Sequence, residues 1–524
     1  MSEAPSPSVM LGRCLVAGLL AIAFASAQGA AAPAGAPPGI AWQAAASDTE
    51  VDRAFALARS SGKPVFLYWG AVWCPPCNQV KATLFARPDF IERSRAFVPV
   101  HVDGDKPGAQ KVAARFRVQG YPTMVLFKAD GTEITRLPGE VDPERYLLAL
   151  SAALDAQVPV RDLIRRALAG QALEPPQWRL LALYSWDTDQ EQVARADELA
   201  SRLEELAARA PRELGEVRDR LALKSLALRS DSGPRDAAQV EAGRQLVDRV
   251  LRDEGTAALH ADLLAAYARS IVKWLAPAGQ ARRDLAARWD TVLRKLAEGQ
   301  PAPSRSAMLD TLDARVSMWK LAADTETLSP QQRAQVLTEV ARIVAATADR
   351  YERQAVVPSA AHVLREAGLI DESDEVLKAE LPRAVAPYYH MLGLAGNARK
   401  RKDTASALRW YEEAWRTSEG PATRLQWGAN YLGNLIELAP QDVSRIEHTA
   451  RTLVGELQPK AETFYERNQR ALLRMSSRLM DWQGKDPARR RAVASVRQQL
   501  AATCAKLPAK DAGRTNCNRL FAAG

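Results

Sequence analysis

The sequence predicts an α/β domain over residues 42–155, followed by a large all-helical region over residues 160–524. Short apolar runs typical of buried strands alternate with helical periodicity as far as residue 155. Strand-like runs then disappear, and amphipathic segments rich in Ala, Leu, Arg and Glu continue almost to the end of the chain. A length of 524 residues also exceeds that of a usual single domain. We therefore expect two parts of different architecture.

The α/β domain is predicted to contain, in order, helix, strand, helix, strand, helix, β-hairpin and helix. The first helix is indicated by apolar side chains spaced for one helix face, and a Ser-Ser-Gly sequence ends it. The hairpin is indicated by the tight-turn pair Asp130-Gly131. The expected helices lie at residues 51–58, 77–85 and 143–154, and the expected strands at residues 65–69, 97–102, 124–127 and 132–136.

Two cysteines lie three positions apart where the first strand gives way to a helix. Positions i and i+3 share a helix face, so Cys74 and Cys77 can close a small disulfide ring. The partial positive charge of the helix N-terminus favours a thiolate on Cys74. This makes Cys74 the candidate nucleophile and Cys77 the resolving thiol. Pro75 and Pro76 stiffen the loop and leave the N–H of Cys77 as a donor toward Cys74.

A bare Cys-x-x-Cys pair also fits a structural disulfide or a metal site. The five histidines, at positions 101, 260, 362, 390 and 448, have no metal-ligand spacing to one another or to the cysteines. We therefore expect no metal and no cofactor. His101 lies in the predicted strand before Asp103 and is a candidate neighbour of the cysteines.

Residues 42–155 resemble the thioredoxin family. The resemblance depends on Trp73-Cys74-x-x-Cys77 after a buried strand, Val102-Asp103, Gly120-Tyr121-Pro122-Thr123 before a strand, and Gly139 after the hairpin. It implies a thioredoxin fold in which Pro122 is cis, packs against the disulfide and helps to hold the substrate backbone. Trp73, Pro75, Pro76, Tyr121 and Thr123 would support that site.

Within the family, the chain is similar to the periplasmic thiol:disulfide interchange type. Cytosolic thioredoxins place a buried aspartate six residues before the first cysteine, where this chain has Tyr68. The lysine partner of that aspartate falls at Pro99. We therefore expect the acid–base step to depend on water or on Tyr68.

The N-terminus has the pattern of a signal peptide over residues 1–27, followed by a flexible lead over residues 28–41. Arg13 precedes an apolar run at residues 15–24, and Ala25-Ser26-Ala27 forms the cleavage site. That run is too short to span a bilayer, so we predict a periplasmic protein without a stable membrane anchor.

Four cysteines remain once Cys14 leaves with the signal peptide, an even number suited to an oxidising compartment. Cys504 and Cys517 bracket a short polar loop and are predicted to form a structural disulfide that fastens the C-terminus. The alternative is an internal relay in which this pair exchanges with Cys74 and Cys77.

Part of the helical region resembles the tetratricopeptide repeat. Leu392-Gly393 and Trp427-Gly428-x-x-Tyr431 lie 35 residues apart, with Ala407-x-x-x-Tyr411-x-x-Ala414 between them and a long loop expected around residues 397–402. The alternative is an irregular helical domain. Tryptophans on helical patterns are assigned to core packing, with a peptide-binding groove as the alternative, at positions 178, 186, 410, 415 and 427.

These features predict a thiol:disulfide oxidoreductase that acts on protein disulfides or dithiols, with a helical domain that recruits a protein or peptide partner. The net charge of +9 is spread along mixed-sign helices without an aromatic-interleaved basic motif, which argues against nucleic-acid binding. The alternatives are a helical scaffold with a structural thioredoxin fold, and a metal-handling Cys-x-x-Cys protein.

Overall fold

The computed structural model describes residues 39–106, 108–137, 143–189, 191–232, 236–299 and 302–522. The predicted signal peptide, most of the predicted lead and Gly139 lie outside the described residues. Residues 39–524 form one compact unit. Among the described helices, none has both the length and the apolar character needed to cross a membrane.

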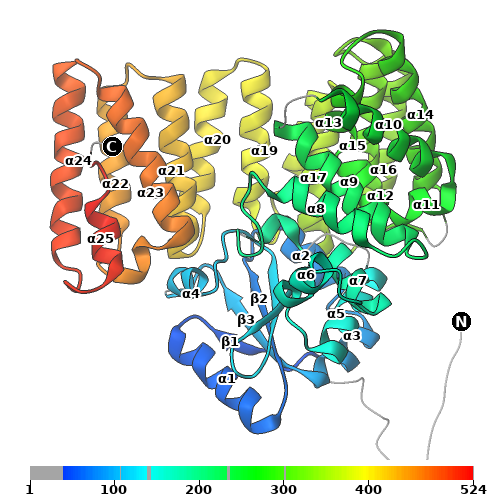
Figure 1. Ribbon diagram of the computed structural model, residues 1–524. Helices are drawn as coiled ribbons and strands as arrows, with labels where there is room; N and C mark the ends of the chain where they lie inside the picture. Colours follow the sequence, from blue (N-terminus) through cyan, green and yellow to red (C-terminus); the bar gives the residue numbers. More distant parts are fainter. Residues whose placement is uncertain are drawn as a thin grey trace, which may run out of the picture. The chain divides into compact units, whose positions relative to one another are not determined.

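A five-stranded mixed sheet forms the centre of the α/β domain (Figure 1). The strand order is β1-β3-β2-β4-β5, in which β2 pairs in parallel with β3 and antiparallel with β4. The predicted α/β class is confirmed, although β1 was not anticipated. The strands are β1 (Gln43–Ala45), β2 (Val65–Gly70), β3 (Val98–Asp103), β4 (Thr123–Phe127) and β5 (Glu133–Leu137).

Helices cover both faces of this sheet, because alternate residues of each strand point to opposite sides. Leu67 and Trp69 pack with α1 and α4, whereas Phe66 and Tyr68 pack with α2, α3 and α5. The apolar face predicted for the first helix is buried, and Gly62 ends that helix with a φ of 67°. The helices are α1 (Asp48–Ser61), α2 (Pro75–Thr83), α3 (Pro88–Arg93), η1 (Ser94–Ala96), α4 (Ala109–Arg115) and α5 (Pro143–Ala156).

Only helices, turns and irregular segments follow α5 in the described residues, which confirms the predicted all-helical region. Its first half comprises α6 (Val160–Leu168), α7 (Pro175–Ala182), η2 (Trp186–Thr188), α8 (Leu199–Arg209), α9 (Gly215–Ser232), α10 (Ala237–Arg252), α11 (Glu254–Leu259), α12 (Ala261–Ala266), α13 (Ala268–Leu275), α14 (Gly279–Ala297) and α15 (Arg305–Ala323). Its second half comprises α16 (Pro330–Ala346), α17 (Arg350–Glu366), α18 (Ile370–Glu380), α19 (Pro387–Lys400), α20 (Thr404–Thr417), α21 (Pro421–Leu438), α22 (Val443–Glu456), η3 (Ala461–Phe464), α23 (Glu466–Gln483), α24 (Pro487–Ala505) and α25 (Ala512–Asn518).

The first helices of this region share a core with the sheet. One continuous apolar cluster runs from Phe66 and Met124 on the strands through Leu163 of α6 and Leu206 of α8 to Leu221 of α9. The hydrophobic effect therefore holds α6 to α9 directly on the α5 side of the sheet. The division between residues 155 and 160 stays a prediction based on sequence pattern, since the core crosses it.

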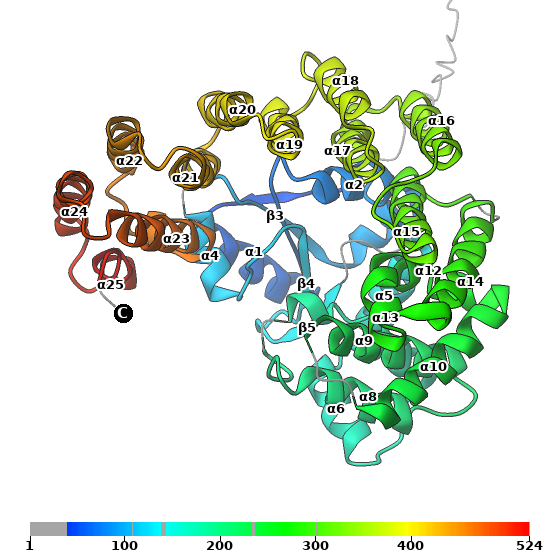
Figure 2. The same cartoon turned by 90° about the horizontal axis from the view of Figure 1, so that it is seen from above.

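Helices α19 to α22 pack against one another in chain order, and Figure 2 shows α16 to α24 following an arc. Gly428 allows close packing, because a Cβ there would lie 2.7 Å from the indole nitrogen of Trp415. The long loop expected around residues 397–402 is wrong, since α19 continues to Lys400. Asn397, a residue common in loops, is instead buried on α19 and donates a 2.9 Å hydrogen bond to the Ser373 hydroxyl.

Candidate active site

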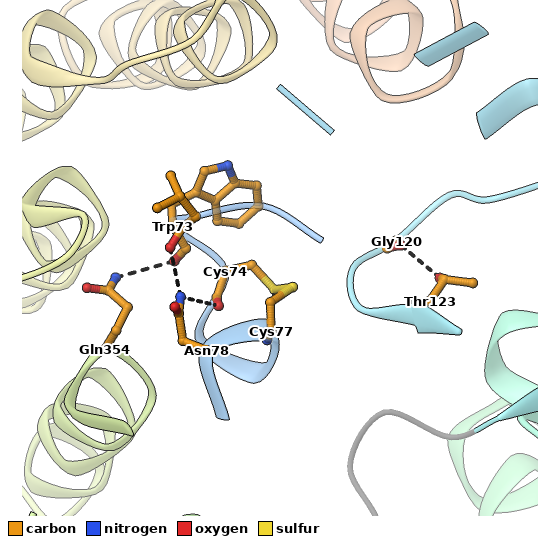
Figure 3. Close-up of a disulfide and its surroundings, with 8 residues drawn as sticks. Trp73, Cys74, Cys77, Asn78, Gly120, Thr123 and Gln354 are labelled. Carbon is orange, nitrogen blue, oxygen red and sulfur yellow. Dashed lines mark hydrogen bonds between the residues drawn. A yellow bond between two sulfur atoms is a disulfide. The ribbon is translucent and has the colours of Figure 1, made fainter. Parts of the chain in front are cut away.

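Cys74 and Cys77 form a disulfide at the start of α2, with their Cα atoms 5.2 Å apart (Figure 3). Cys74 is the N-cap of α2, and Pro75 and Pro76 occupy the first two helical positions. Proline is favoured there because its fixed φ suits the helix and the missing N–H has no helical acceptor. The backbone N–H of Cys77 donates to the Cys74 sulfur over 3.2 Å, as the sequence predicted.

Asn78 fixes the loop that carries the disulfide. Its side-chain amide donates to the carbonyl oxygens of Val72, at 2.7 Å, and of Cys74, at 2.9 Å. The side chain is fully buried, so these bonds satisfy groups that would otherwise be costly to bury. The sequence reasoning missed Asn78, although a polar residue on the buried helix face directly after Cys77 was a usable signal.

The loop at residues 120–123 faces the disulfide (Figure 3). The Tyr121–Pro122 peptide bond is cis, which confirms that part of the prediction. The Thr123 hydroxyl donates to the Gly120 carbonyl oxygen over 2.9 Å, and the Tyr121 hydroxyl accepts from Gln110 at 2.9 Å. Burial raises the pKa of Tyr121 to about 12, so its hydroxyl stays protonated at neutral pH. The loop is thereby held in one conformation beside the cysteines.

Tyr68 and Pro99 occupy the positions where cytosolic thioredoxins have an aspartate and a lysine, and His101 lies beside Tyr68. The Tyr68 ring stacks on His101 with centroids 5.0 Å apart, and within the described residues its buried hydroxyl has no hydrogen-bond partner. Burial raises the pKa of Tyr68 well above its usual value, and burial with the charge of Lys81 lowers the pKa of His101 to about 4. Pro99 pairs with Phe66 in the sheet. Both Tyr68 and His101 are therefore neutral at pH 7.

Helices of the second half of the chain cover Trp73. Its ring meets Trp427 edge-on at 4.7 Å and stacks on Tyr389 at 6.0 Å, and the Arg467 guanidinium lies 5.5 Å from it. Gln354 of α17 donates to the Trp73 carbonyl oxygen over 3.3 Å (Figure 3). Trp73 is consequently 9% exposed, while Cys74 is 2% and Cys77 0% exposed. Because Gln354 and Trp73 are 281 positions apart in the sequence, no local pattern could have indicated that these helices cover Trp73.

Two further contacts join the same edge of the α/β domain to the helical region. Asp105, in the loop after β3, accepts hydrogen bonds at Oδ1 from the backbone N–H of Thr423, at 2.8 Å, and from its hydroxyl. Burial raises the pKa of Asp105 to about 6. The Lys111 ammonium pairs with Asp511 over 3.1 Å. The disulfide therefore lies at an interface within one chain.

Cys504 and Cys517 form the second disulfide, between the end of α24 and α25, with Cα atoms 5.7 Å apart. Both cysteines are buried. Figures 1 and 2 both place α24 and α25 away from α2. Exchange between this pair and Cys74–Cys77, the internal relay, stays a prediction.

The tryptophans singled out in the sequence differ in their surroundings. Trp178, Trp186 and Trp415 are buried in apolar clusters, Trp410 is half-buried, and Trp427 contacts Trp73. In the part of the chain that the structure describes, no three His, Cys, Asp or Glu side chains are grouped to hold a metal ion.

Comparisons with known proteins place this geometry in a class. A sequence model of the thioredoxin-like domain matches residues 51–154. The thiol:disulfide interchange protein DsbD 2 of Pseudomonas aeruginosa is 30% identical over 19% of this chain and 17% of its own length. A thioredoxin of Mycolicibacterium smegmatis is 34% identical over 18% of this chain and 81% of its own length. A solution structure of a thioredoxin from Thermus thermophilus, 29% identical, aligns over 22% of this chain and 86% of its own with a TM-score of 0.20.

The α/β domain is thus a thioredoxin-like domain with a disulfide-forming Cys-x-x-Cys pair. The chain belongs to the thioredoxin family of thiol:disulfide oxidoreductases through this domain. The chain spans only about a fifth of the length of the interchange proteins that it matches.

Proposed function

We propose that the protein is a secreted, periplasmic thiol:disulfide oxidoreductase that exchanges disulfides with protein partners through the Cys74-Pro75-Pro76-Cys77 couple. The observation that carries this proposal is the Cys74–Cys77 disulfide at the N-terminus of α2, facing the cis-Pro122 loop. A helix N-terminus stabilises a thiolate, and the 3.2 Å contact supplies an N–H to the Cys74 sulfur.

In the reduced protein, the Cys74 thiolate attacks one sulfur of a partner disulfide. The partner S–S bond breaks, a mixed disulfide forms, and the departing partner thiolate takes a proton from water. Cys77 then gives its proton to water, and its thiolate attacks the Cys74 sulfur. The bond from Cys74 to the partner breaks, the second partner thiolate leaves and takes a proton from water, and the Cys74–Cys77 disulfide remains. Two electrons pass from this couple to the partner, and the reverse sequence oxidises a partner dithiol. Because the raised pKa of Tyr68 makes it a weak acid and the lowered pKa of His101 makes it a weak base, the proposal assigns proton transfer to water.

The loop residues orient the partner in this proposal. Pro122 and Tyr121 form one wall of the substrate site, and Trp73 forms the other. Pro75 and Pro76 stiffen the turn between the cysteines, and the Thr123 hydroxyl holds the Gly120 carbonyl in place. Because Cys74 is 2% exposed, a protein partner reaches its sulfur only after the contacts of Trp73 with Trp427 and Tyr389 open.

The predicted signal peptide over residues 1–27 supports export, and relatives named thiol:disulfide interchange proteins support the reaction. The helical region over residues 160–524, with its repeat-like pairs α19 to α22, would recruit the partner. The paired packing and the position of these helices over Trp73 support that role.

The test compares insulin reduction and dithiol oxidation by the wild type and by Cys74→Ser. We expect the variant to lose activity by about a thousandfold or more, as is usual when a nucleophile is removed. Cys77→Ser should accumulate mixed disulfides with partners that are visible on non-reducing gels. Equal activity of wild type and Cys74→Ser would exclude the proposal.

The burial of the disulfide favours a second candidate, a helical interaction scaffold in which the Cys74–Cys77 bond is structural. The scaffold predicts that neither assay detects exchange, that Cys77→Ser traps no partner, and that the native protein keeps its Cys74–Cys77 disulfide in the presence of a dithiol.

A further inference from the structure

A basic cavity lies next to the cis-Pro122 loop and is separate from the disulfide. It measures about 350 Å³ and lies between α23, α21 and α19, with Gln119 at one end and Trp427 in its wall. The cavity is lined by four arginines of α23, which lie three or four positions apart and therefore share one face of the helix. They are Arg467, Arg470, Arg474 and Arg478.

Within the described residues, three of these four guanidinium groups form no ion pair with a carboxylate. Arg470 pairs with Glu466 over 2.7 Å and also donates to the Gln119 carbonyl oxygen over 2.9 Å. The Arg467 guanidinium donates to the neutral Gln426 side chain, at 3.1 and 3.2 Å. Among the described residues, no carboxylate lies within ion-pair distance of Arg467, Arg474 or Arg478, and Asp105 acts on Arg467 only from further away. The cavity therefore holds uncompensated positive charge, which attracts an anion.

Arg467 is partly buried, and within the described residues its charge is offset at a distance by Asp105 without an ion pair. Burial, with the charges of Arg470 and Arg474, lowers the pKa of Arg467, although Tyr121 and Asp105 act in the opposite direction. A partly buried cation without a direct ion pair is unfavourable, so a carboxylate placed beside Arg467 would gain more than one paired with an ordinary surface arginine.

Gly433 on α21 makes room for one of these arginines. A Cβ at position 433 would collide with the Arg478 guanidinium, which lies directly against the α21 backbone. The absence of a side chain at this position thus keeps Arg478 at the cavity wall. The arrangement involves two helices and is more than a solvated row of charges on α23.

The cavity adjoins the redox site through Arg467 and Gln119. The Arg467 guanidinium lies 4.9 Å from the Tyr121 ring and 5.5 Å from the Trp73 ring, the two walls of the substrate site. Gln119 immediately precedes the Gly120–Thr123 loop. A ligand that fills the cavity therefore lies beside the position of a polypeptide bound against Pro122.

We propose that this cavity binds an acidic segment of the client protein next to the client's reacting cysteine. The inference depends on the proposed function, because it assigns the class of substrate to that same site. Eleven residues of helix separate Arg467 from Arg478, a distance of about 16 Å, which an extended segment of about five residues spans. Asp or Glu side chains within a few residues of the client cysteine would form bidentate pairs with these arginines.

The test uses the reduced full-length protein and two synthetic peptides with the same internal disulfide. One peptide has four Asp or Glu residues beside a cysteine, and the other has Asn and Gln in their place. The variant is Arg474→Gln with Arg478→Gln, both exposed on α23. The control of equal charge is Arg491→Gln with Arg497→Gln, both exposed on α24.

We expect the acidic peptide to have a KM about tenfold lower than the neutral one, as two partly exposed ion pairs would give, with kcat alike. The variant should lose this preference, and the control pair should keep it. Raising the salt concentration should weaken the preference, since exposed charges are screened. Equal KM values for the two peptides in the wild type, or the same loss in the control pair, would overturn the inference.

A binding measurement separates this inference from the proposed function. Fluorescence anisotropy of an acidic peptide with Ser in place of both cysteines reports docking without thiol chemistry. Binding that the variant loses supports the acidic-segment site even if neither peptide is reduced, and in that case only the proposed function fails. No binding by the wild type overturns the site. Displacement of the peptide by inorganic phosphate, at concentrations where chloride has no effect, would assign the cavity to phosphate and also overturn it.

Discussion

The Cys74–Cys77 and Cys504–Cys517 disulfides are equally buried, but they lie at opposite ends of helices. Cys74 caps the N-terminus of α2, where the helix dipole favours a thiolate. Cys504 lies in the last turn of α24, where the dipole disfavours one. Their loops also differ, since the first pair is separated by 3 positions and the second by 13. Burial alone therefore does not separate the two disulfides, whereas helix position and loop length do, and these two features favour the redox role proposed for Cys74–Cys77.

The largest expected effect is on the free energy of unfolding when either disulfide is removed. Replacing both Cys504 and Cys517 by Ser should lower the free energy of unfolding by about 3 kcal/mol, because the bond closes the longer loop, whereas the same change at Cys74 and Cys77 should cost about 2 kcal/mol. Urea unfolding measures both. Disulfide exchange at 25 °C should persist in the first variant only, and its loss there would support the relay and contradict a purely structural role.

A smaller expected effect is the pH dependence of stability that Asp105 causes at the edge of the α/β domain near Cys74. Asp105 has a pKa raised to about 6 by burial, and its Oδ2 is buried without a hydrogen-bond partner in the described residues. An acid with a raised pKa binds a proton on folding, so stability falls as pH rises from about 4 to about 6. Asp105→Asn removes that penalty and should raise the free energy of unfolding at pH 7 by about 2 kcal/mol.

Unfolding at pH 4.5 and pH 7 checks this, and the variant should show the flatter profile. Asp130→Asn is the control, because the backbone N–H of Thr132 lowers the pKa of that exposed carboxylate. Its contribution has the opposite sign, being present at neutral pH and lost as pH falls. An unchanged profile for Asp105→Asn would show that Asp105 is not desolvated in solution.

The smallest effect concerns the cover of the redox couple. Gln354→Met keeps the side-chain volume but removes the hydrogen bonds to the Trp73 and Ala386 backbone, at a cost of about 1 kcal/mol. A phosphine reductant should then reduce Cys74–Cys77 faster while the rate at Cys504–Cys517 is unchanged. Gln499→Met, which removes a bond from α24 to the Arg451 carbonyl, is the matched control. Equal acceleration of both bonds would indicate general loosening.

Local sequence patterns were sufficient for most of the α/β domain. The strand before Cys74 and the hairpin turn have short-range signals, because their residue types restrict the backbone directly. The cis bond at Pro122 was expected from the family resemblance, since an X-Pro pair alone favours trans. The strand β1 was missed, since Gln43–Ala45 lacks β-branched residues and pairs with β3 through its backbone. The short helix α3 was also missed, although Pro88 at its first turn was an available signal.

The cover of the site could not be predicted in the same way. Trp73 meets Trp427, Tyr389 and Gln354 through contacts that span hundreds of residues, and single-sequence periodicity contains no information about such pairs. Core packing is predicted for Trp427 and is confirmed, but no local pattern indicates that this core includes Trp73 of the Cys-x-x-Cys loop.

The packing of α2 against α17 also has a consequence for the order of synthesis. Ribosomes make the chain from its N-terminus, so Cys74 and Cys77 exist long before Gln354 does. Throughout that interval the nascent chain has both cysteines but no helix to cover them. During that time the cysteines lack the contacts that Trp73 makes with Gln354, Tyr389 and Trp427, and completion of α17 to α21 adds them.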